Sequence, residues 1–147
     1  MKSLVVFISV EHGNTEKMAK AIAEVLDADL KDAKDVDPHD IQSYDLIGFG
    51  SGIHNGKFHA RLLKLINEMP TSHSEVFIFS TGGYGKTEYH ADLKKELEAI
   101  GLQVVGDFVC KGWNTYGSFK LIGGINKGRP NEQDLAHARE FAKRLMA

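Results

Sequence analysis

The sequence predicts an α/β fold in which one parallel sheet carries helices on both faces. Apolar runs bounded by Gly, Ser or Asp alternate with segments whose apolar residues recur every three or four positions. The runs are typical of buried parallel strands, and the recurring residues are typical of helices with one buried face. Strand and helix in alternation require right-handed crossovers, so we expect a doubly wound sheet. Ligands of such sheets bind at the carboxyl ends of the strands, where the function is to be sought.

These patterns predict five strands and four helices. Apolar runs predict strands at 4–8, 46–49, 76–79 and 104–110, and the short polar segment 29–33 predicts a strand at the sheet edge. Apolar stripes predict helices that cover 18–26, 62–69, 93–100 and 135–145, the first of which begins at about Asn14. Asn131 after Pro130, with Asp134 three residues later, marks the start of the last helix. Segment 37–40 leaves room for at most a short helix.

Length, charge and cysteine content favour one cytoplasmic domain, residues 1–147. A chain of 147 residues can bury a substantial core without disulfides or metals. Its 18 Lys and Arg stand against 20 Asp and Glu, so the overall charge gives no reason to expect binding to nucleic acid or membrane. Cys110 is the only cysteine, which fits a reducing compartment. The apolar segment 1–10 is too short for a signal peptide or a membrane span, so we expect a soluble protein.

The segment after the first strand is suited to an anion. Its polar and glycine residues are Ser9, Glu11, His12, Gly13, Asn14 and Thr15. Gly13 permits a tight turn of the backbone. The free amides of the first helical turn point into the loop, and Asn14 and Thr15 add side-chain donors. A phosphate group fits this description. The alternative is that Asn14 or Thr15 simply caps the helix.

Three segments that follow the first, third and fourth strands resemble the cofactor loops of the flavodoxin-like family. They are His12-Gly13-Asn14-Thr15-Glu16-Lys17, Gly50-Ser51-Gly52-Ile53-His54-Asn55-Gly56 and Ser80-Thr81-Gly82-Gly83-Tyr84. The resemblance extends over the whole chain. It implies that the first segment holds the phosphate of FMN and that the other two flank its isoalloxazine ring. It also implies a five-stranded sheet with the order 2-1-3-4-5.

The first segment departs from the family pattern. Flavodoxins commonly carry hydroxyl residues where this chain has Val10, Glu11 and His12, and the nearest hydroxyl here is on Ser9. The Glu11 carboxylate would repel phosphate, so we expect it to face solvent. The resemblance then leaves the phosphate to the backbone amides, Asn14, Thr15 and His12, unless His12 also points outward.

The second segment carries His54 where flavodoxins often place a large aromatic residue against the ring. The pair Asn55-Gly56 tolerates positive φ, so the peptide between these residues can turn over with little strain. By analogy with the family, the turned carbonyl accepts a hydrogen bond from N5 of the reduced flavin and favours the one-electron-reduced state. The alternative is an ordinary tight turn.

The resemblance implies that Thr81, Gly82 and Gly83 of the third segment supply backbone amides to the flavin, and Tyr84 is a candidate ring cover. Trp113, in the long connection 111–130, is the other candidate, or it covers the core instead. That connection holds Lys111, Lys120, Lys127 and Arg129 and no acidic residue. This favours a negatively charged partner or a phosphate-bearing substrate over the cationic partner that is usual in the family; the alternative is that these are solvated lysines on a surface loop.

Other functional patterns are weaker. Segment 80–87 matches a nucleotide-triphosphate P-loop except at Ser80, but no aspartate ends the third strand to hold magnesium. The same missing aspartate argues against a phospho-acceptor receiver domain. Gly48, Gly50 and Gly52 make a poor dinucleotide fingerprint. His54, His59, His73 and His90 lack the spacing of metal ligands, so no metal is predicted and we interpret them as surface histidines. Cys110 is expected to be buried.

The leading hypothesis is an FMN electron carrier that shuttles one or two electrons between redox proteins and has no catalytic residues of its own. The alternative is an FMN-dependent NAD(P)H or quinone-type oxidoreductase, with an apolar slot formed by Trp113, Tyr116 and Phe119. These aromatics could instead build a homodimer face through 111–130; otherwise the protein is a monomer. A third hypothesis is a binding protein that has lost the flavin.

Overall fold

The strands of this protein form one twisted sheet. The computed structural model describes residues 1–147 except 9–12, 55, 83–86, 112–127 and 147. Within that part of the chain, five parallel strands lie in the order β2-β1-β3-β5-β6. Their bounds are β1 (Ser3–Ile8), β2 (Asp29–Asp32), β3 (Leu46–His54), β5 (Glu75–Gly82) and β6 (Gln103–Lys111). This order confirms the prediction, and the structure adds a two-residue strand, β4 (Lys57–Phe58), that pairs antiparallel with β3.

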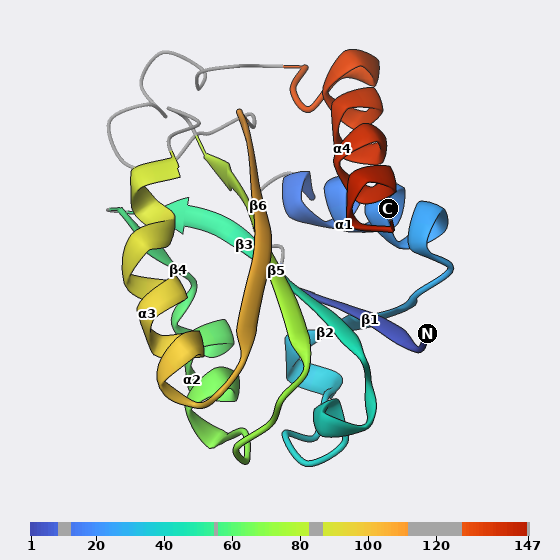
Figure 1. Ribbon diagram of the computed structural model, residues 1–147. Coiled ribbons are helices and arrows are strands. Elements are labelled where there is room, and N and C mark those ends of the chain that lie inside the picture. The colour runs from blue at the N-terminus through green and yellow to red at the C-terminus, as the bar shows by residue number, and fades with distance from the viewer. Residues whose placement is uncertain (9–12, 55, 83–86, 112–127, 147) are drawn as a thin grey trace.

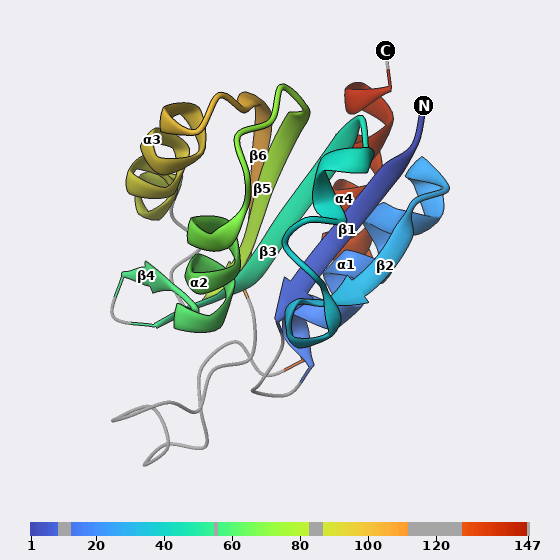
Figure 2. The ribbon, with the colours of Figure 1, turned by 90° about the horizontal axis from the view of Figure 1, so that it is seen from below.

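Helices cover both faces of the sheet, as the alternating pattern predicts (Figures 1 and 2). One face carries α1 (Asn14–Leu26) and α4 (Glu132–Leu145), and the other carries α2 (Ala60–Glu68) and α3 (Ala91–Ala99). Three short 3-10 turns, η1 (Ala33–Asp35), η2 (Ile41–Ser43) and η3 (Thr87–His90), complete the described elements. The first two lie between β2 and β3, where at most a short helix is predicted.

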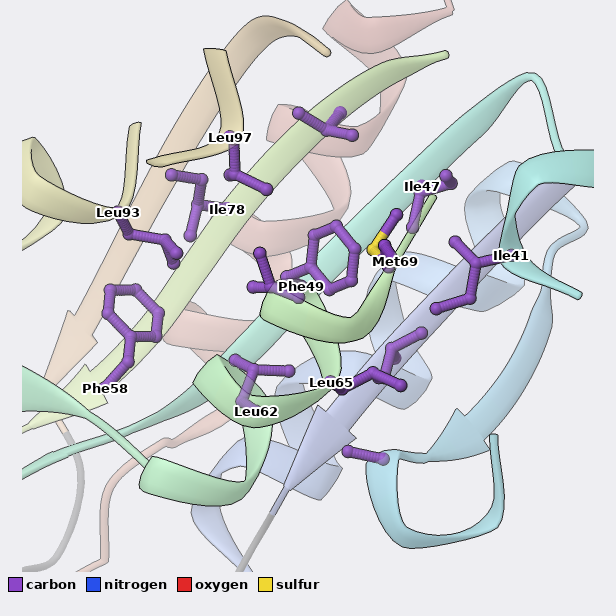
Figure 3. Close-up of a cluster of buried hydrophobic side chains, with 14 of the residues drawn as sticks. Ile41, Ile47, Phe49, Phe58, Leu62, Leu65, Met69, Ile78, Leu93 and Leu97 are labelled. Carbon is purple, nitrogen blue, oxygen red and sulfur yellow. The ribbon is translucent and has the colours of Figure 1, made fainter. Parts of the chain in front are cut away.

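The sheet divides the core into two apolar layers. Side chains alternate along β5, so Val76 and Ile78 face α2 and α3, while Phe77 and Phe79 face α1 and α4. Figure 3 shows the first layer, in which Ile78 and Phe49 lie among Leu62 of α2 and Leu93 of α3. Both layers are shielded from water, which explains why the predicted strands read as continuous apolar runs.

β3 and β5 extend beyond their predicted ends. The prediction ends them at Phe49 and Phe79, but pairing continues through Ser51 with Ser80 and Gly52 with Thr81. Parallel pairing satisfies the backbone groups here even though the side chains are polar. Residues that the sequence places in loops therefore lie in rigid strands at the carboxyl edge of the sheet.

The helix starts agree closely with the sequence. α1 begins at Asn14 and α4 follows the predicted cap at Asn131. The Asn131 side chain accepts from the Asp134 amide at 2.9 Å, and the Asp134 carboxylate accepts from the Asn131 amide at 2.8 Å. This reciprocal pair is the capping box that the spacing predicts. None of the helices within the described ranges is long and apolar enough to cross a bilayer.

Candidate functional site

The first predicted segment ends in a left-handed turn at Gly13. Gly13 has φ 65° and ψ 23° and precedes the first residue of α1. A Cβ at this position would meet no atom within 4 Å, so φ rather than packing calls for glycine. Among the described residues, no side chain caps α1. Asn14 and Thr15 are the first two residues of α1, and Gly13 takes the N-cap position. Ser9, Glu11 and His12 lie outside the described residues.

Thr15 joins the first segment to the third. Thr15 and Thr81 are 2% and 3% exposed, and their hydroxyl oxygens lie 2.8 Å apart in a hydrogen bond. Asn14 is also buried, beside Thr15 at the start of α1. Asn14 and Thr15, which the sequence predicts as anion-binding residues, thus lie at the carboxyl edge of the sheet, next to the end of β5.

The second segment is a hairpin rather than a loop. Ile53 pairs with Phe58 and His54 with Lys57, so residues 55 and 56 connect β3 and β4. Gly56 has φ 75°, in agreement with the predicted positive φ. The Ser51 hydroxyl donates to the Gly52 carbonyl at 2.8 Å and accepts from the His59 amide at 3.0 Å, which fixes the base of the hairpin. Asn55 and the side chain of His54 lie outside the described part of the structure.

The third segment contacts the second. Gly52 of β3 pairs with Thr81 of β5, and a Cβ added to Gly82 would lie 3.4 Å from the Cβ of Ile53, so the ends of β5 and β3 lie side by side. Ser80 points to the opposite side of the sheet from Thr81, because neighbouring residues of a strand alternate in direction. Gly83, Tyr84 and Trp113 fall among the residues that the structure does not describe, and the stacking predictions for Tyr84 and Trp113 stay predictions.

His90 is not a surface histidine, and this prediction is wrong. It is fully buried at the end of η3, where its Nε2 lies 2.6 Å from the Ser80 hydroxyl and its Nδ1 lies 2.8 Å from Oδ2 of Asp107. Lys94 contacts the same carboxylate oxygen at 3.2 Å. The four side chains come from four elements, so no spacing in the sequence predicts that they meet.

Burial lowers the pKa of His90, while the hydrogen bond that its ring donates to Asp107 raises it. The lowered pKa favours the neutral imidazole. The Asp107 carboxylate accepts from Nδ1–H, so Nε2 is left to accept from the Ser80 hydroxyl. His59 has a different role, since its Nδ1 accepts from the Arg61 amide at the start of α2.

A family model described as a flavodoxin domain matches residues 4–117. This chain belongs to the flavodoxin family. The match includes β1, β3 and β5, which carry the three segments, and so agrees with the resemblance of those segments to flavodoxin loops.

Several known proteins are similar to this flavodoxin-family chain over most of its length. An uncharacterized protein of Methanocaldococcus jannaschii is 46% identical over 148 residues, which cover 99% of each chain. A solved flavodoxin from the domain Archaea is 18% identical, with a TM-score of 0.73 and full coverage of both chains. A Lactobacillus acidophilus flavoprotein solved in complex with FMN is 22% identical, with a TM-score of 0.60 over 72% of this chain and 91% of that one.

The residues of the rival motifs have structural roles in this fold. Ser80, Thr81 and Gly82 belong to β5, so the first three residues of the P-loop match form a strand rather than a loop. Gly48 and Gly50 lie inside β3 against the rings of Phe77 and Phe79, which accounts for the apparent dinucleotide fingerprint. No cluster of three potential metal ligands occurs in the described ranges.

Cys110 and Arg129 both form interactions within the described part of the chain. Cys110 is buried as predicted; burial raises the pKa of its thiol to about 12, and the thiol donates to the Lys111 carbonyl at 3.1 Å. Arg129, one of the basic residues of the long connection, forms a two-point ion pair with Asp134. Its charge therefore stabilises the start of α4 and is not free for a partner.

Proposed function

We propose that this flavodoxin-family chain binds FMN at the carboxyl edge of its sheet and carries electrons between redox proteins. The observation that carries the proposal is the hydrogen bond between Thr15 and Thr81. It brings the predicted phosphate segment against one of the two predicted ring segments. The pairing of Gly52 with Thr81 brings the other ring segment to the same edge.

The described residues at the start of α1 suit a phosphate. Gly13 turns the chain without a side chain in the way, and the first amides of α1 carry the partial positive charge of the helix N-terminus. Asn14 and Thr15 would hold the phosphate together with these amides. The donors are uncharged and need no metal, which matches the chemistry of a dianion held by backbone groups.

The described residues near the ends of β3 and β5 suit a flat aromatic ring. Ser51 and Ser80 are buried and bonded below the edge, so the strands that carry both ring segments are rigid. Gly56, at φ 75°, would allow the peptide that precedes it to present either its N–H or its carbonyl at the ring. FMN, when bound, supplies one- and two-electron transfer, and the chain binds it, orients it and sets which redox state is favoured.

The partner is proposed as a redox protein, because no described side chain at the edge is arranged as an acid, base or nucleophile for a bound substrate. A negatively charged partner suits Lys111, Lys120 and Lys127 of the long connection. We expect this exchange to occur in the cytoplasm, in keeping with the single buried Cys110.

Stepwise photoreduction of the FMN-loaded protein tests the carrier function. A carrier is expected to accumulate one-electron-reduced flavin and to pass its electrons to another redox protein, with slow turnover of small quinones. Direct two-electron reduction with rapid quinone turnover would contradict the carrier function and favour the oxidoreductase. Absence of a bound-flavin spectrum after reconstitution would contradict the whole proposal.

A further inference from the structure

The buried chain Ser80–His90–Asp107 has the connectivity of a hydrolytic triad, yet it cannot act as one. Ser80 is 2% exposed and lies inside β5, paired with Ser51 on one side and Val109 on the other. Its hydroxyl donates to the neutral His90, but no substrate carbonyl can reach the oxygen from this position. The hydrogen bonds of Ser80, His90 and Asp107 are therefore considered as structural rather than catalytic interactions.

The neutral ring of His90 has one consistent set of hydrogen bonds. Asp107 accepts from Nδ1–H while it also contacts the ammonium group of Lys94, and Nε2 accepts from Ser80. Every polar atom of the imidazole thus has a partner, so its orientation is fixed from both sides. A buried, fully bonded network of this kind restricts the groups that it joins to one arrangement.

The network connects to both predicted ring segments, through Ser80 of the third segment and through Phe58, the partner of Ile53 in the second. The His90 ring packs on Phe58, with the centroids 5.3 Å apart at a tilt of 46°. Phe58 pairs with Ile53, and Ile53 is the nearest side chain to the Cα face of Gly82, where an added Cβ would lie 3.4 Å from the Ile53 Cβ. Gly82 lies two residues beyond Ser80 in β5. The series of neighbouring residues therefore begins and ends in the same strand, and it runs through Ser80, His90, Phe58, Ile53 and Gly82. The neighbour Tyr89 faces the hairpin, since a Cβ added to Gly56 would lie 3.5 Å from its Cε1 atom.

We propose that His90 is a positioning residue that sets the separation between the β3–β4 hairpin and the end of β5, and with it the width of the slot for the flavin ring. The inference rests on the proposed FMN site. His90 does not touch the reacting atoms; it acts through Ser80 on one segment and through Phe58 on the other. Asp107 and Lys94 hold the imidazole in the tautomer that this requires.

The test compares three variants. In the double variant Ser80→Ala, His90→Leu, both partners of the 2.6 Å bond are removed, so neither is left buried without a partner. We expect this variant to fold and to bind FMN about tenfold more weakly than the native protein. The visible circular dichroism of the bound flavin should change as well. His90→Gln keeps an acceptor for Ser80 and is expected to recover most of the affinity. His39→Leu, at an exposed histidine, is the control and should change the affinity by less than about twofold.

Nuclear magnetic resonance of the flavin-free protein separates this inference from FMN binding itself. The native His90 ring should show the neutral Nδ1–H tautomer at pH 7, and the double variant should shift the amide signals of Gly56 and Gly82. An Nε2–H tautomer, or amide signals that do not move, would overturn the positioning role whether or not FMN binds. Native affinity and unchanged circular dichroism in the double variant would overturn it too. Failure of the native protein to bind FMN would instead refute the proposed function.

Discussion

Two threonine hydroxyls link the candidate phosphate segment to the sheet. Thr15 and Thr81 are both buried and are bonded to each other at 2.8 Å. Thr15→Val preserves the shape of the side chain but leaves the Thr81 hydroxyl without this partner. We expect the free energy of unfolding to fall by about 1–3 kcal/mol, measured by urea denaturation. The affinity for FMN should fall in the same variant.

The control for this substitution is Thr71→Val, at an exposed threonine. Its unfolding free energy should change by no more than about 0.5 kcal/mol. Equal stability of the native protein and the Thr15→Val variant would show that the hydroxyl pair does not hold the two segments together.

Tyr44 makes the fold sensitive to alkaline pH. Its hydroxyl donates to Oδ2 of Asp29 at 2.6 Å, and this hydrogen bond, together with burial, raises the pKa of Tyr44 to about 12 from 10.0. Above pH 10 the phenol ionises in the unfolded chain but stays protonated in the folded one. This contribution to stability is therefore complete below pH 10 and is lost as the pH rises to 12.

The raised pKa corresponds to at most about 2–3 kcal/mol, and solvent screening at the exposed Asp29 carboxylate reduces this contribution. Urea denaturation between pH 9 and 12 should show this loss in the native protein and a smaller loss in Tyr44→Phe. Cys110, whose pKa is also raised to about 12, adds to the decline from pH 9 in both proteins. Identical slopes in the two proteins would contradict the role of Tyr44.

At the scale of elements, β3 and β5 fit together because glycines of one strand lie against aromatic rings of the other. A Cβ on Gly50 would approach the Phe79 ring to 2.1 Å, and a Cβ on Gly48 would approach Phe77 to 2.2 Å. Gly50→Ala must displace the Phe79 ring and is expected to destabilise the fold by about 1–3 kcal/mol.

Thermal or urea unfolding of Gly50→Ala checks this prediction, and a second substitution identifies the cause. Phe79→Leu in the Gly50→Ala background should cost less than the sum of the two single changes, because the smaller side chain leaves room for the new methyl group. Strict additivity would mean that the ring is not the obstacle.

α4 depends on the cap at its first turn. The side chain of Asn131 and the carboxylate of Asp134 bond reciprocally, and Arg129 holds that carboxylate in place. Asn131→Ala should lower the unfolding free energy by about 1 kcal/mol. Asn131→Ser retains a capping oxygen and should restore most of the loss in the same urea experiment. If Ser and Ala were equally destabilising, the cap would not be the stabilising feature.

At the scale of the whole molecule, the sequence predicts the architecture well because both faces of the sheet are buried. Burial leaves a direct pattern in the sequence: it produces the apolar runs at 4–8 and 76–79 and the apolar stripes of α1 and α4. The ends of β3 and β5 are not predicted, since Ser51, Thr81 and Gly82 are held there by backbone pairing and not by apolar side chains. The hairpin strand β4 is missed for the same reason.

The site is predicted only where local chemistry determines it. Gly13 and Gly56 have the positive φ that their turns require, and Asn14 and Thr15 begin α1 as expected. The network around His90 depends on contacts between residues 80, 90 and 107, which only the folded sheet brings together. A histidine ten residues beyond a strand serine carries no local signal of burial.

The central claim is that this edge of the sheet holds FMN through its phosphate. Calorimetric titration of the flavin-free protein with FMN and with riboflavin, which lacks the phosphate, tests it most directly. We expect one FMN per chain and at least about 100-fold weaker binding of riboflavin, because several charge-assisted hydrogen bonds are lost with the phosphate. No heat of binding with FMN, or equal affinity for the two flavins, would contradict the claim.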